Sequence, residues 1–185
     1  ITRKNRWDNY RLNIIYEGGI GVKKLLLVLL ALLIGCGIKG PENNMPETMP
    51  DDFAFKVQYG YYRNDEVDTF NGTVTKDLIE DGKATTEIIF TQEELKDIYS
   101  KMREINITSP KELEPKIIDC QHEPHYDFGL KVQINEEITE YTWSGQYCEP
   151  SKDAGEIEDL IAYIHSLVKE KPEYKKLPEP TGGYD

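Results

Sequence analysis

The feature that most constrains this chain is the segment 22–36, which reads VKKLLLVLLALLIGC. Two lysines precede an uninterrupted apolar run at residues 25–34. A run of about ten apolar residues is well short of the ~18–20 that a membrane-spanning helix needs, and it is typical of the hydrophobic region of a secretory signal peptide. A short core helix with an incidental cysteine is the alternative, although lysines before the run and Gly-Cys-Gly after it are not typical of one. The segment therefore predicts export from the cytoplasm.

The end of this segment adds a second signal. Leu33, Ile34, Gly35 and Cys36 follow one another, and this order resembles the lipobox of bacterial lipoproteins. The resemblance implies cleavage before Cys36, acylation of its sulfur and a lipid anchor in the cell membrane, with the domain facing outside the cytoplasm. A single acyl chain binds a membrane only marginally, whereas two or three anchor a protein stably.

Residues 1–21 are unusual in front of a signal peptide, which normally begins with its positive region. Glu17, Gly18 and Gly19 are what a purine-rich ribosome-binding site encodes when it is read in frame. We expect residues 1–21 to be an over-extended reading of the gene, with Val22 as the true start. The alternative is a long basic leader, since this stretch contains several arginines and lysines.

Cleavage before Cys36 would leave 150 residues with 16 Lys and Arg against 32 Asp and Glu, a formal net charge of −16. A chain of that length can form one domain with its own core. Such an acidic surface repels nucleic acid and bare anionic lipid, so neither is an expected partner. It keeps a domain soluble, and it favours cations or a basic partner.

Under this interpretation the three cysteines have two different roles. Cys36 takes the lipid, which leaves Cys120 and Cys148 to pair in an oxidising compartment. Closing that loop of about 29 residues would stabilise the fold by roughly 3–4 kcal/mol in the chain-entropy model.

Hydropathy patterns predict the regular elements of the domain. Period-two alternation predicts strands at 53–59, 69–79 and 84–90, with a loop at 60–68. Thr91 and Glu94 fit a capping box that starts a helix running to about Ile105. A hairpin is expected over 126–143 with its turn at 135–137, and a second helix follows a cap at 151–153 and ends before Pro172.

This order predicts an α+β fold, an antiparallel β-sheet with two helices packed on one face, in the order βββ-α-ββ-α. Residues 36–52 hold three prolines among polar residues and are expected to form a lipid-anchored flexible tether. The globular domain is expected at 53–171, followed by a Pro-rich C-terminal tail at 172–185.

One segment, 119–127, is dense in side chains that bind metals. It contains Asp119, Cys120, His122, His125 and Asp127. Zinc and copper favour such ligands, yet Pro124 breaks any helix that would aim both histidines at one ion, and a disulfide would remove the thiolate. We therefore interpret it as a disulfide-bearing polar loop, with metal binding as the alternative.

Aromatic side chains with a polar tip suit recognition surfaces. Those that would line a binding face are Tyr59, Tyr61, Tyr62, Tyr141 and Trp143, with Tyr147 beside them. Filling the core of the sheet is the alternative role for these residues.

The sequence shows no catalytic constellation or phosphate-binding loop, and no cofactor is expected. Beyond the lipobox, the chain is similar to small lipoproteins of low-GC Gram-positive bacteria, a resemblance that supplies no activity. The sequence thus predicts a non-enzymatic binding module with a protein, peptide or cell-wall partner. Metal binding through the 119–127 loop is the second hypothesis, and an envelope hydrolase is the third.

Overall fold

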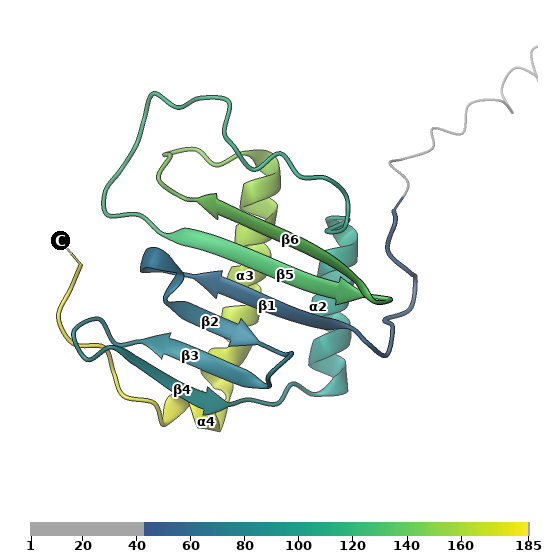
Figure 1. Ribbon diagram of the computed structural model, residues 1–185, viewed down its shortest axis with the longest axis horizontal. Coiled ribbons are helices and arrows are strands. Elements are labelled where there is room, and N and C mark those ends of the chain that lie inside the picture. Colours follow the sequence, from purple (N-terminus) through teal and green to yellow (C-terminus); the bar gives the residue numbers. More distant parts are fainter. Residues whose placement is uncertain (1–42, 185) are drawn as a thin grey trace, which may run out of the picture. The chain divides into compact units, whose positions relative to one another are not determined.

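The computed structural model describes residues 43–184. The predictions on residues 1–21, on the signal segment and on the acylation of Cys36 concern residues outside this range. Within it, the chain forms six strands in one antiparallel sheet, in the order β4-β3-β2-β1-β5-β6. The two long helices, α2 and α3, lie on the same face of that sheet (Figure 1). The predicted α+β fold is therefore confirmed.

The elements occur along the chain in the following order: β1 (Ala54–Tyr59), the short 3-10 helix η1 (Tyr61–Arg63), β2 (Asp65–Asp68), β3 (Thr73–Asp77), β4 (Lys83–Glu87), α2 (Gln92–Glu104), β5 (Asp127–Ile134), β6 (Glu137–Ser144), α3 (Lys152–Glu170) and the short α4 (Pro172–Lys175).

The number of strands before the first helix is larger than predicted. The stretch 60–68 was expected to be a loop, whereas it contains η1 and strand β2. Strand β2 reads DEVD, and Val67 is its only apolar residue. Val67 is fully buried, while the Asp68 carboxylate pairs with Lys56 on β1 at 2.7 Å. Pairing with β1 and β3 makes this segment a strand, and its own sequence pattern does not reveal it.

The starts of the two long helices and the turn of the hairpin lie where the sequence predicts them. The Thr91 hydroxyl accepts a hydrogen bond from the Glu94 amide at 3.2 Å, and the Glu94 carboxylate accepts one from the Thr91 amide at 2.7 Å. Ser151 caps α3 by accepting from the Ala154 amide at 3.0 Å. The β5–β6 hairpin turns through Asn135 and Glu136, both at positive φ.

The core lies between the sheet and the two long helices. Alternate residues of each strand point toward the helices, as the period of two requires. The large side chains with no more than 2 % exposure include Phe55, Val57, Val67, Val74, Leu130 and Val132 from the sheet and Ile98, Met102, Ile157, Ile164 and Val168 from the helices.

The segments before and after the predicted globular domain both make contacts with it. In the tether predicted for 36–52, the described part packs against α2: Met45 is 3 % exposed, and the Pro46 carbonyl accepts hydrogen bonds from Tyr99 at 2.8 Å and Arg103 at 3.1 Å. The folded domain therefore begins before residue 53. The sequence obscured this because a single buried methionine among prolines and polar residues leaves no periodicity.

The Pro-rich C-terminal tail, predicted at 172–185 beyond the globular domain, also contacts the domain. The Thr181 amide donates to the Leu78 carbonyl at 3.2 Å, and the Tyr184 hydroxyl donates to the Asp77 carboxylate. The Tyr184 ring lies 4.1 Å from that of Tyr61. These contacts tie the end of the chain to the β3–β4 turn and to η1.

Candidate functional site

The candidate site is a groove beside the loop that carries Cys120 and Cys148. The two sulfurs lie 1.90 Å apart and the two Cα atoms 5.5 Å apart, which is disulfide distance. Backbone hydrogen bonds flank the pair, from the Cys148 amide to the Cys120 carbonyl at 3.1 Å and from the His122 amide to the Gln146 carbonyl at 2.9 Å. We call residues 120–122 and 146–148 the disulfide clasp. The clasp holds two loops together.

Gly145 lets the chain leave β6 and enter the clasp. Its amide donates to the Tyr126 carbonyl at 2.8 Å. A Cβ atom at this position would lie 2.8 Å from that carbonyl oxygen and 3.0 Å from the Phe128 ring, closer than side chains tolerate. The glycine is therefore required for the close approach of the two strands at the mouth of the groove.

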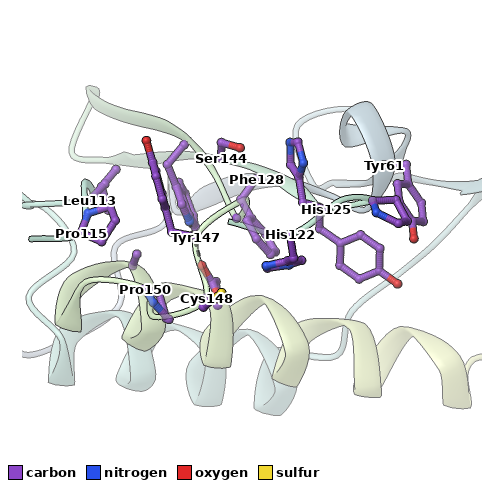
Figure 2. Close-up of a pocket in the computed structure, with 16 residues that line it drawn as sticks. Tyr61, Leu113, Pro115, His122, His125, Phe128, Ser144, Tyr147, Cys148 and Pro150 are labelled. Atoms are coloured by element: carbon purple, nitrogen blue, oxygen red, sulfur yellow. Dashed lines mark hydrogen bonds between the residues drawn. The ribbon is translucent and has the colours of Figure 1, made fainter. Parts of the chain in front are cut away.

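The groove has a cavity volume of about 440 Å³ and runs along α3 (Figure 2). Aromatic residues and prolines make up half of its lining residues, and they come from loops, strands and η1 that are far apart in the sequence. The aromatic residues are Tyr61, Tyr126, Phe128, Trp143 and Tyr147, and the prolines are Pro115, Pro124 and Pro150. In the close-up, Leu113 and Pro115 mark one end of the groove and Tyr61 the other.

The floor of the groove is built around Trp143. Its side chain is 7 % exposed and stacks on Phe128, with ring centroids 5.2 Å apart and planes 17° apart. The indole Nε1 donates a hydrogen bond to the Glu158 carboxylate at 3.0 Å. This contact joins β6 to α3, and it places one acidic group among aromatic and aliphatic surface.

Burial raises the pKa of the Glu158 carboxyl above its ordinary value. The hydrogen bond from Trp143 partly offsets that effect, and the nearby charge of Asp159 adds to it. Glu158 is only half-buried, so an opposite charge entering the groove could reach it.

The two histidines of the 119–127 segment both line the groove. The His125 Nδ1 atom lies 2.8 Å from the Glu123 carboxylate, and its Nε2 atom lies 3.6 Å from the Asp127 carboxylate. Asp119 is exposed and does not line the groove. Over residues 43–184, no three His, Cys, Asp or Glu side chains gather as a metal site would require, so the metal-binding hypothesis finds no ligand set there.

The predicted aromatic face does not form as one surface. Tyr59 is 9 % exposed and packs under α3 against His165, with rings 4.9 Å apart. The Tyr141 hydroxyl donates to the carbonyls of Ile107 and Ser109 at 3.1 and 2.6 Å, so it anchors the loop after α2.

Tyr61 and Trp143 do reach the groove, whereas Tyr62 is 78 % exposed and does not line it. Tyr59, Tyr141 and Trp143 all occupy the helix-covered face of the sheet, and of these three Trp143 lines the groove. The opposite face is polar, as the Lys56–Glu66 pair at 3.4 Å illustrates.

Sequence reasoning missed Glu158 as a site residue. A signal was present: Glu158 follows Ala154 by four positions, so the two share a face of α3 at the edge of its apolar stripe. An acidic residue at such a boundary position is a candidate for a cavity floor.

A second hollow of about 440 Å³ adjoins the groove, and Pro115 and Pro150 line both. Its acidic residues are Glu112, Glu114, Glu149 and Asp153, and its basic residues are Lys116 and Lys152. The two hollows together form an elongated depression along one end of the domain.

Two further findings bear on the site. No helix among residues 43–184 combines the length and the hydropathy that a transmembrane span needs. No protein-family model, curated protein or solved structure matches this chain.

Proposed function

We propose that this chain is a lipid-anchored lipoprotein displayed outside the cytoplasm, and that its folded domain is a non-enzymatic binding module. The signal segment at 22–36 and the lipobox ending at Cys36 support the address. The Cys120–Cys148 pair at disulfide distance supports an oxidising compartment. The ligand site in this proposal is the groove between the disulfide clasp and α3.

The observation that carries the binding role is the construction of the groove itself. Aromatic walls with a few placed polar groups are the usual composition of ligand sites. Here the rings fix one another in pairs: Trp143 stacks on Phe128, and Tyr61 packs edge-on against Tyr126 with ring centroids 4.9 Å apart. A preorganised wall of this kind loses little conformational entropy when a ligand binds.

Exposed apolar side chains line the groove and the hollow beside it. Tyr126 lines the groove and Ile117 the second hollow, and both are more than half exposed. Exposed apolar surface often marks interaction sites. They give a ligand in the groove additional surface to contact.

Binding is favoured over catalysis because two polar side chains that line the groove, His125 and Glu158, already have partners in the described part of the domain. His125 contacts Glu123 and Asp127, and Trp143 donates to Glu158. Such contacts orient side chains for recognition, whereas a nucleophile requires a base in hydrogen-bond contact with it.

The proposal is tested with the full chain in a neutral detergent, carrying Trp7→Phe so that Trp143 is the only tryptophan. The probes are short basic, acidic and neutral peptides and oligomers of N-acetylglucosamine. We expect at least one class to change Trp143 fluorescence saturably, and we expect Tyr147→Ala to weaken that response. Tyr62→Ala, at an exposed position outside the groove, is the matched control.

Two results would overturn the proposal. One is the absence of a saturable response from every probe class. The other is saturable binding, measured by calorimetry, that Tyr147→Ala and Tyr62→Ala affect equally.

A further inference from the structure

We propose that the groove receives a cationic side chain of a basic peptide, an arginine guanidinium or a lysine ammonium, which approaches Glu158 between the aromatic walls. This inference rests on the proposed function and names the ligand class of the same site.

The first argument is the unpaired acid in the floor. One Glu158 oxygen accepts the Trp143 indole hydrogen bond, and none of the ion pairs among residues 43–184 includes Glu158. A half-buried carboxylate without a cation carries a desolvation cost, which an opposite charge relieves. A ligand cation can supply that charge.

The second argument is the charge of the walls and the rim. Within the part of the chain that the structure describes, Glu158 is the only Asp or Glu that lines the groove, and no lysine or arginine lines it. The surrounding segments, 117–130 and 144–151, contain Asp119, Glu123, Asp127 and Glu149 without a lysine or arginine, and Lys116 and Lys152, next to these segments in the sequence, line the adjoining hollow. Negative charge around a cleft with low-dielectric walls concentrates cations there and repels anions.

The third argument is the aromatic lining. A cation over the face of a Trp, Tyr or Phe ring is attracted by the ring quadrupole, and guanidinium groups also stack on such rings. Elsewhere in this domain, the Lys101 ammonium lies 4.5 Å from the centroid of the Tyr163 ring. In the groove, Tyr61, Tyr126 and Tyr147 offer rings, and among residues 43–184 no lysine or arginine of the protein lines it.

The fourth argument concerns length, and it favours a peptide over a small amine. The second hollow continues the groove past Pro115 and Pro150, and the labelled side chains in Figure 2 extend along α3 from Leu113 to Tyr61. An extended chain can place one cationic side chain at Glu158 and continue into the neighbouring hollow. That hollow has more acidic than basic residues, which suits further basic residues of the peptide.

The test uses the full chain with Trp7→Phe in neutral detergent and an acetylated, amidated hexapeptide with two adjacent arginines. The control peptide has citrulline, a neutral isostere, in place of both arginines. We expect the arginine peptide to bind about tenfold more tightly, the usual scale for a partly desolvated charge pair. This comparison needs no protein variant, so it does not depend on the folding of any mutant.

Variants then locate the cation. Glu158→Gln is expected to remove most of the preference for arginine over citrulline, whereas Glu87→Gln, on the exposed edge strand β4, is expected to keep it. Arginine amide alone is expected to bind at least about tenfold more weakly than the hexapeptide, because it leaves the second hollow empty.

Equal binding of the two peptides would overturn the inference, and so would an arginine preference that Glu158→Gln leaves intact. Arginine amide that binds as tightly as the hexapeptide would overturn the choice of a peptide. If the citrulline peptide or a sugar oligomer still binds in the groove, by the Tyr147→Ala criterion, the proposed function stands without this inference. If no probe binds saturably, both fall.

Discussion

The Trp143 indole donates a hydrogen bond to the Glu158 carboxylate across 3.0 Å, from strand β6 to helix α3. Trp143 is buried, so the contact gives a half-buried acid that lines the groove one fixed partner. The arrangement makes Glu158 the residue through which the electrostatics of the groove can be tested.

Glu158→Gln is predicted to change the pH dependence of stability. Burial raises the pKa of Glu158 in the folded state, so the folded protein binds the proton more tightly than the unfolded chain. The stability that this proton contributes is present below the unfolded pKa of about 4.5 and is lost as the pH rises through the folded pKa. The free energy of unfolding of Glu158→Gln, relative to the parent chain, should therefore increase between pH 4 and pH 7, by up to about 1 kcal/mol after allowance for partial exposure.

Urea unfolding of both chains at pH 4, 5.5 and 7 measures this difference. Glu87→Gln is the control for removal of one exposed carboxylate. A difference between Glu158→Gln and the parent that stays constant with pH would contradict the prediction.

Reduction of the Cys120–Cys148 bridge is predicted to lower the free energy of unfolding by about 3–4 kcal/mol in the chain-entropy model. Both cysteines are exposed, so a reductant can reach them. The double variant Cys120→Ser with Cys148→Ser should show the same loss without reductant. Urea unfolding with and without dithiothreitol measures it, with Cys36→Ser as a control that keeps the full sensitivity to reductant. An unfolding midpoint that does not move on reduction would show that the clasp adds no stability.

His165 is predicted to make the domain sensitive to mild acid. Its ring packs 4.9 Å from Tyr59, and burial, together with the charges of Lys169 and Lys76, lowers its pKa to about 4. The unfolded chain, with a histidine pKa of about 6.5, therefore binds the proton first. The folded state keeps its full stability above about pH 6.5 and loses stability as the pH falls from there toward 4, by on the order of 1–2 kcal/mol after allowance for partial exposure.

Thermal unfolding of the parent and of His165→Gln at pH 7, 5.5 and 4.5 checks this prediction. The variant is less stable at pH 7 because it disturbs the packing against Tyr59, but its unfolding temperature should fall less between pH 7 and 4.5. Parallel pH profiles for the two chains would contradict the role assigned to His165.

The capping box of α2 is predicted to stabilise the folded domain. Thr91→Ala removes the hydroxyl that accepts the Glu94 amide and should cost about 1 kcal/mol of unfolding free energy. Glu94 also receives the Lys171 ammonium at 2.6 and 2.7 Å, so this end of α2 is connected to the end of α3. Thr142→Ala, on the exposed side of β6, is the control in urea unfolding. A loss no greater than that of the control would contradict a stabilising cap.

Elements with a strong local signal were predictable from the sequence. The capping box of α2, the apolar stripe of α3 and the alternation across the β5–β6 hairpin depend on neighbours within a few residues, and all three were predicted. Strand β2 was not, because Val67 alone carries its apolar signal and partner strands supply its hydrogen bonds. Met45 was likewise assigned to a tether, because its own segment shows no apolar pattern and its burial comes from the core cluster that it shares with residues of α2.

The candidate site was predictable only in part. Residue types and spacing singled out the cysteine pair, the 119–127 loop, Tyr61 and Trp143, but they could not show that these residues meet in one groove. Glu158 lies 15 positions after the indole that contacts it, and Tyr61 lies far earlier in the chain. Tertiary packing sets these distances, and contacts with His165 and with the loop after α2 give Tyr59 and Tyr141 structural roles that residue type alone does not reveal.

The most direct test of the central claim, that the groove is the ligand site, is amide hydrogen exchange of the full chain with and without the arginine hexapeptide. The account predicts slower exchange in segments 119–128 and 143–150, with no change in β2, β3 and β4. Slower exchange confined to β2–β4, or an unchanged groove in a sample that binds the peptide saturably, would place the ligand on the open face of the sheet and contradict the account.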